Sequence, residues 1–151
     1  MEKIKVFAAV SISAILAYFE PIQNVLVSVS WLFVLNFLFG LLAGLVANKE
    51  RFSFRKAFVC ISEASVFLLI LAVVFYIGDH IGVRAGALQA VSTITYALIY
   101  FYSVNIFKNL RQLFPGSKTI AFIHYLISVE ILQKLPHLNH FLRKEYRENP
   151  D

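Results

Sequence analysis

The sequence predicts an all-α fold, a small bundle of helices that crosses a membrane several times. Of its 151 residues, 59% are apolar and only 15% are charged, whereas soluble domains carry about 45–50% apolar and about 25% charged residues. The apolar residues fall into long uninterrupted runs, and no strand-like alternation of apolar and polar residues persists anywhere. The length allows one domain, and a single cysteine excludes an internal disulfide framework.

Three apolar runs are long enough to cross a bilayer. A helix needs roughly 20 residues to span about 30 Å of hydrocarbon, because every backbone amide must be bonded within the segment. The runs at 25–47, 57–77 and 85–107 meet this requirement. Together with an earlier run they predict a membrane domain over residues 1–118, with three to four spanning helices at about 4–20, 22–47, 54–77 and 85–113.

The first apolar run, at 6–19, is shorter and reaches only about 21 Å as a helix. Three alternatives remain open for it: it spans a thinned bilayer, it lies in the membrane interface, or it is removed as a signal peptide. Because no small-residue cleavage site follows it, we expect an uncleaved first helix.

Polar and helix-breaking residues separate the runs. Pro21 suits the first turn of a helix. In the hairpin at 48–53, Asn48 is placed to end one helix and Ser53 to cap the next. The sequence Gly-Asp-His-Ile-Gly at 78–82 is expected to end the third helix, and Pro-Gly-Ser at 115–117 the fourth, with Ser117 or Thr119 capping the helix that follows.

The basic residues predict the orientation. If four helices span, 13 of the 14 Lys and Arg residues lie on one side and only Arg84 lies on the other. Cytoplasmic loops are enriched in Lys and Arg, so both termini and the basic hairpin are expected in the cytoplasm. The net charge of +5 (14 − 9) is therefore a topology signal, and no nucleic-acid partner is expected. The hairpin contributes Lys49, Arg51, Arg55 and Lys56.

Residues 119–151 are expected to form a cytoplasmic amphipathic helix and a basic tail. Isoleucine and leucine recur at helical spacing and give one apolar stripe that ends before Pro136. The segment is expected to lie on the membrane, pack on the bundle or join subunits, and these three alternatives stay open. The stripe consists of Ile120, Ile123, Ile127, Ile131 and Leu135.

One small-residue face in the second helix is a candidate for close helix packing or oligomerisation. Gly40 and Gly44 form a GxxxG step, which lets two helix backbones approach closely in lipid. The helix that packs there belongs either to the same chain or to another subunit. The candidate residues are Asn36, Gly40, Ala43 and Gly44.

Polar residues within the third and fourth helices are candidates for a pore wall or a polar contact face. Glu63 lies about two turns into the third helix, where it either reaches the headgroups or pairs with Lys56 or Lys108, or else lines a water-filled lumen. The fourth helix carries a weakly polar stripe that suits either a pore wall or hydrogen bonds within a closed bundle. The candidates are Glu63, Gln89, Ser92, Tyr96 and Asn105.

No enzymatic chemistry is indicated. The four histidines are scattered, and the phosphate-binding, hydrolase and paired-carboxylate motifs are absent from the sequence. His137 and His140 are two possible metal ligands without a third. We therefore expect neither a catalytic site nor a cofactor nor a metal.

The order of these features resembles the phage holins of the toxin-secretion and phage-lysis type. The resemblance covers roughly residues 18–118 and is carried by YFEPI at 18–22, NFLFGLLAG at 36–44, NKERFSFRK at 48–56 and NIFKNLRQLFPGSK at 105–118. Two departures are Asn36, where the family commonly has Asp, and the extension beyond residue 118.

The resemblance implies a small protein that accumulates in the bacterial cytoplasmic membrane and assembles into homo-oligomers. Such assemblies permeabilise the membrane, collapse the proton-motive force and enable release of a murein hydrolase or a toxin. Two alternatives remain: a pore-type effector of an antiviral defence system, activated by a partner, and a non-pore membrane subunit of a larger complex.

Overall fold

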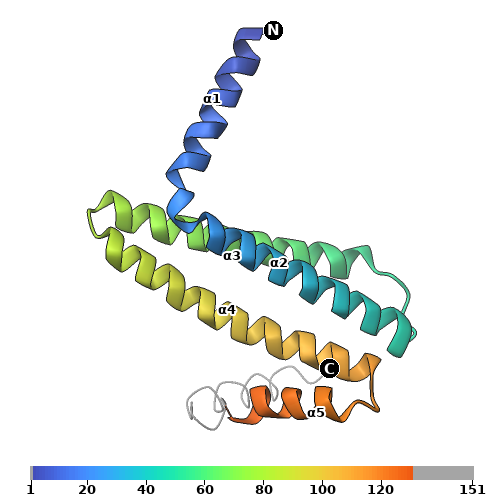
Figure 1. The fold of residues 1–151 in the computed structure, drawn as a ribbon. Helices are drawn as coiled ribbons and strands as arrows, with labels where there is room; N and C mark the ends of the chain where they lie inside the picture. Colours follow the sequence, from blue (N-terminus) through green and yellow to red (C-terminus); the bar gives the residue numbers. More distant parts are fainter. Residues whose placement is uncertain (1, 131–151) are drawn as a thin grey trace. The chain divides into compact units, whose positions relative to one another are not determined.

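A computed structural model describes residues 2–130, and within this range the chain is entirely helical, as the sequence predicts. The helices are α1 (Glu2–Tyr18), α2 (Glu20–Leu42), α3 (Phe54–His80), α4 (Arg84–Leu113) and α5 (Lys118–Tyr125). Two π-helical turns, η1 (Ala43–Ala47) and η2 (Leu126–Glu130), follow α2 and α5 directly. Figure 1 shows these elements in chain order.

Three helices in the described range are long and apolar enough to cross a membrane. They are Glu20–Ala47, formed by α2 with η1, then α3 and α4. The helix α1 is apolar but has only 17 residues, about 26 Å at the α-helical rise. The three long runs in the sequence therefore correspond to three long helices, and the alternatives for the first run remain.

The chain divides into two compact units, and α2 and α4 each contribute to both. Unit 1 comprises Met1–Phe37 and Ser53–Ile99. Unit 2 comprises Leu38–Phe52 and, among the described residues, 100–130. The second unit therefore contains the end of α2 with η1, the residues 48–52 with Lys49 and Arg51, the second half of α4, α5 and η2.

Unit 1 has a core of large apolar side chains from α2, α3 and α4. The Phe33 ring of α2 stacks on the Phe67 ring of α3, with 6.4 Å between centroids. Close-packed contacts of this kind replace the hydrophobic effect between helices that face lipid. The fully buried side chains are Ile22, Val29, Leu71, Phe75 and Val91.

The break between α1 and α2 lies at Phe19, two residues before Pro21. Proline lacks an N–H, which the first turn of a helix does not need, so Pro21 fits just inside α2. The side chains of α1 are mostly exposed, including Phe7 and Leu16. Its last residue, Tyr18, holds it to α3 through a ring contact with Phe75 at 5.9 Å. Figure 1 shows α1 leaving the direction of α2 at this break.

The third helix ends later than the sequence predicts, at His80 instead of Ile77. Gly78 does not terminate the helix. It is buried and faces Ala87 of α4, where a glycine allows the two backbones to approach. The turn falls instead at Gly82, which adopts φ +82°, a conformation that glycine tolerates without steric cost.

The predicted caps at the other helix ends are confirmed. Ser53 accepts a hydrogen bond from the Lys56 amide at 3.5 Å and caps α3. Of the two candidates before α5, Ser117 is the cap, and it accepts from the Ile120 amide at 3.4 Å. Asn48 is the C-cap of η1, and Lys49 follows it with φ 54°.

The described part of the predicted amphipathic tail forms α5 and η2 and packs on α4 within unit 2. The Tyr100 hydroxyl of α4 donates to the Ile127 carbonyl at 3.5 Å. The turn at 114–117 lies between these residues, so the two helices run antiparallel, as Figure 1 shows. Ile120, Ile123 and Ile127 lie on the less exposed face. The remainder of the tail, with Ile131, Leu135, His137 and His140, lies outside the described residues.

Candidate functional site

The packed face of α4 is defined by its buried side chains. Ala87, Val91 and Leu98 are buried in unit 1, and Tyr102 and Ile106 are buried in unit 2. At about 100° per residue these five positions cluster on one side of the helix. Before Tyr100, the opposite side of α4 is therefore the side available to lipid or to another molecule.

The predicted polar residues of α4 lie on that opposite side. Gln89, Ser92 and Tyr96 are separated by three and four residues and thus share one face. All three are exposed, Tyr96 to 73%. Thr93 lies beside them, and its hydroxyl donates to the Gln89 carbonyl at 2.9 Å. We call Gln89, Ser92, Thr93 and Tyr96 the outer stripe.

The hydroxyl of Thr93 is satisfied by its own helix, but the side-chain amide of Gln89 is not. Within residues 2–130, no hydrogen bond satisfies this amide. An amide in hydrocarbon gains from a hydrogen-bonding partner on another helix, by about 1 kcal/mol. The outer stripe is thus a polar face, within a helix of spanning length, that the described chain leaves open.

Asn105 does not belong to this face. It lies 16 residues after Gln89, which at about 100° per residue places it about 160° around the helix. Asn105 is exposed, yet its direction is that of the packed face. Asn105 therefore lies apart from the outer stripe, and its assignment as a pore-wall or polar-face candidate stays a prediction.

The small-residue face of α2 and η1 packs within the chain. Asn36 is only 7% exposed and Ala43 only 1%. A Cβ added to Gly40 would lie 3.5 Å from the Asn109 side chain of α4, and one added to Gly44 would lie 3.7 Å from the Glu50 carboxylate. Of the two alternatives for this face, the geometry favours packing against the same chain.

Glu63 lies on the outside of α3, not in the core of unit 1. It is the tenth of the helix's 27 residues, about 14 Å along the axis from Phe54. Exposure at this depth is compatible with a carboxylate that reaches the headgroups and with one that lines a lumen, so both alternatives remain.

The basic hairpin is exposed along its length, as expected for a loop at a membrane surface. Lys49, Arg51, Arg55 and Lys56 are all exposed. At the α3–α4 turn, in contrast, Arg84 pairs with Asp79 at 3.6 Å and lies over the Phe75 ring at 5.8 Å. Arg84 thus has an acidic and an aromatic neighbour, and the four hairpin residues form an exposed basic surface.

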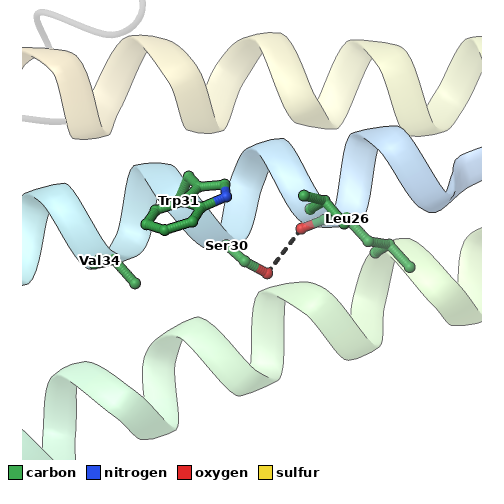
Figure 2. Close-up of a pocket in the computed structure, with 5 residues that line it drawn as sticks. Leu26, Ser30, Trp31 and Val34 are labelled. Carbon is green, nitrogen blue, oxygen red and sulfur yellow. Dashed lines mark hydrogen bonds between the residues drawn. The ribbon is translucent and has the colours of Figure 1, made fainter.

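A hollow on α2 is a feature that sequence patterns did not identify. Leu26, Val27, Ser30, Trp31 and Val34 line a space of about 360 Å³, as Figure 2 shows. Its one hydroxyl, on Ser30, donates to the Leu26 carbonyl at 2.8 Å. Trp31 is 65% exposed. Ligand sites combine apolar walls with convergent polar groups, and this hollow offers only apolar walls, which suit a lipid chain.

No group of three potential metal ligands occurs among the residues that the structure describes. Comparison of the chain with protein-family models, with curated proteins and with solved structures finds no match. The features of the molecule that bear on function are the outer stripe and the distribution of exposed apolar and basic residues.

Proposed function

We propose that this protein inserts into the bacterial cytoplasmic membrane, associates with further copies of itself and permeabilises the membrane, as a holin does. Its functional partner would then be a murein hydrolase or a toxin that the permeabilised membrane releases. The observation that carries the proposal is the outer stripe, a polar face exposed on a helix of spanning length.

The energetics of polar groups in lipid explain why such a stripe favours self-association. An isolated copy exposes Gln89, Ser92 and Tyr96 to hydrocarbon. Two facing stripes can exchange hydrogen bonds worth roughly 0.6–1 kcal/mol each, and a ring of stripes can face water. Because these contacts are weak, assembly requires a high surface concentration, so accumulation sets the time of permeabilisation.

The exposed hairpin and the capped helix ends support the proposed topology. With both termini cytoplasmic, Lys49, Arg51 and Arg55 meet the anionic inner leaflet, where each basic residue contributes about 1 kcal/mol of attraction. Only Arg84 lies on the outer side in a four-span arrangement, and there it pairs with Asp79.

The test is expression of the chain alone in bacteria, with membrane potential and entry of an impermeant dye followed over time. The unmodified protein should depolarise cells abruptly after a lag, and a co-expressed cytoplasmic murein hydrolase should then lyse them. A stripe variant, Gln89→Leu with Ser92→Ala, should lengthen the lag or abolish depolarisation. The matched control is Ile99→Leu, an exposed apolar position of α4 beyond the outer stripe.

Three results would contradict the proposal. Accumulation in the membrane without depolarisation would indicate a non-pore subunit. Depolarisation only with a co-expressed second protein would indicate a partner-activated effector. Equal lags for the stripe variant and the unmodified protein would remove the outer stripe from the mechanism.

A further inference from the structure

The polar face of α4 continues beyond the outer stripe, but there its exposure changes. Tyr100 and Ser103 follow Tyr96 at intervals of four and three residues and so lie on the same face. Both are half-buried, whereas Gln89, Ser92, Thr93 and Tyr96 are all exposed. We call Tyr100 and Ser103 the inner stripe.

The α5–η2 segment accounts for this difference in exposure. It is joined to the inner stripe by the hydrogen bond from Tyr100 Oη to the Ile127 carbonyl, across 27 residues of chain. Its isoleucine face is half-buried, whereas Phe122 and Tyr125 are each 62% exposed on its other side. The segment therefore contacts the inner stripe at Tyr100.

Three features show that this docking is weak. The hydrogen bond is 3.5 Å long, at the outer limit for such contacts. The α-helical part of the segment has only eight residues before it changes to π geometry, and π turns are frequent at functional sites. The Ser128 Oγ is buried and has no hydrogen-bond partner in the described chain, which costs about 1–3 kcal/mol.

We propose that α5–η2 is a detachable cover over the inner stripe and that it competes with a second copy of the chain for this surface. Undocking extends the open polar face from Gln89–Tyr96 to Gln89–Ser103. The length available for self-association rises from about 10 Å to about 21 Å, because the two stretches cover seven and 14 residue steps. The inference rests on the proposed self-association and adds its regulation.

The test uses the full chain in vesicles of phosphatidylethanolamine and phosphatidylglycerol that contain a fluorescent dye, over a series of protein-to-lipid ratios. Tyr100→Phe removes the hydrogen bond to Ile127 and keeps the ring. It should lower the protein density for half-maximal dye release by about twofold, the lower end of what a hydrogen bond contributes, because this bond is long. The matched control is Tyr125→Phe, because Tyr125 is an exposed tyrosine of α5. This substitution should leave the density unchanged.

A second variant should shift the density in the opposite direction. Ser128→Ala removes the buried hydroxyl that has no partner, so it should strengthen docking and raise the density for half-maximal release by twofold or more. Opposite shifts for Tyr100→Phe and Ser128→Ala support the cover. Unchanged densities, or a rise with Tyr100→Phe, overturn it, since Tyr100 would then act only as a contact between copies.

Cross-linking of the same vesicles separates this inference from the proposed function. Suppose that neither the unmodified protein nor any variant releases dye, but that cross-linked oligomers increase with Tyr100→Phe and decrease with Ser128→Ala. This result would contradict the proposed permeabilisation and support the detachable cover. If the unmodified protein releases dye and neither substitution changes release or cross-linking, the cover fails and the proposed function stands.

Discussion

Gly78 of α3 and Ala87 of α4 face each other so closely that a Cβ built on Gly78 would lie 2.5 Å from the Ala87 Cβ and 3.2 Å from its Cα. The close approach brings the two helices together next to the α3–α4 turn. It follows from the absence of a side chain at residue 78, because no second methyl group fits beside that of Ala87.

Gly78→Ala should therefore destabilise unit 1 by about 1–3 kcal/mol, the usual cost of an overpacked core. The measurement is the thermal unfolding midpoint in detergent. Gly86→Ala is the matched control, since nothing lies within 4 Å of a Cβ at that position. The double variant Gly78→Ala with Ala87→Gly moves the methyl group across the contact and should recover most of the loss. An equal loss in the double variant would contradict the steric explanation.

Gly40 gives a contrasting prediction, because a Cβ there would make only ordinary contact with Asn109, at 3.5 Å. Gly40→Ala should be neutral or slightly stabilising, since alanine favours a helix by about 1 kcal/mol over glycine. Gly40→Leu should displace Asn109 and lower the unfolding midpoint. If Gly40→Leu instead left this midpoint unchanged and reduced cross-linked oligomers, Gly40 would be a contact between subunits.

Lys49 carries a local strain that substitution can relieve. It has φ 54°, a left-handed conformation that costs a non-glycine residue roughly 1 kcal/mol, and it follows the C-cap of η1. Lys49→Gly should stabilise the protein by about 0.5–1 kcal/mol in chemical or thermal unfolding. Lys49→Ala removes the charge without relieving the strain, so it should not stabilise. Equal gains from both variants would assign the effect to charge.

His124 makes the stability of the packing of α5 on α4 depend on pH. Burial lowers the pKa of His124 below its ordinary value of 6.5, and the charges of Arg111 and Lys108 lower it further. The docked segment thus binds the proton less readily than the undocked one. Docking is favoured fully above pH 6.5 and loses stability as the pH falls through 6.5 toward the lowered pKa.

The measurement is an NMR titration of the His124 side chain in detergent micelles. Its midpoint should lie below 6.5, and Arg111→Gln should raise it only in part, because burial is the larger cause. Tyr100→Phe, by favouring the undocked segment, should bring the midpoint closer to 6.5. A midpoint at or above 6.5 in the unmodified protein would show that His124 is not buried by docking.

The sequence alone determined the helical class, the three long apolar helices and the cap at Ser53, and it reduced the cap before α5 to Ser117 or Thr119. These features depend on local properties: the length of an apolar run, and a hydroxyl placed three residues before a free amide. The face shared by Gln89, Ser92 and Tyr96 is likewise a consequence of helical period. The same period places Asn105 on another side of α4.

Only the tertiary structure decided which faces are covered. Gly78 begins a sequence that is typical of a helix end, but its contact with Ala87 makes it a packing position inside α3. The GxxxG step at Gly40 and Gly44 looks the same whether it meets its own chain or another subunit, and the position of Asn109 favours the first. The α5 segment had three possible locations, and its hydrogen bond to Tyr100 favours packing on α4. Contacts between residues distant in sequence depend on how helices pack, and a pattern of spacing within one helix carries no information about its neighbour.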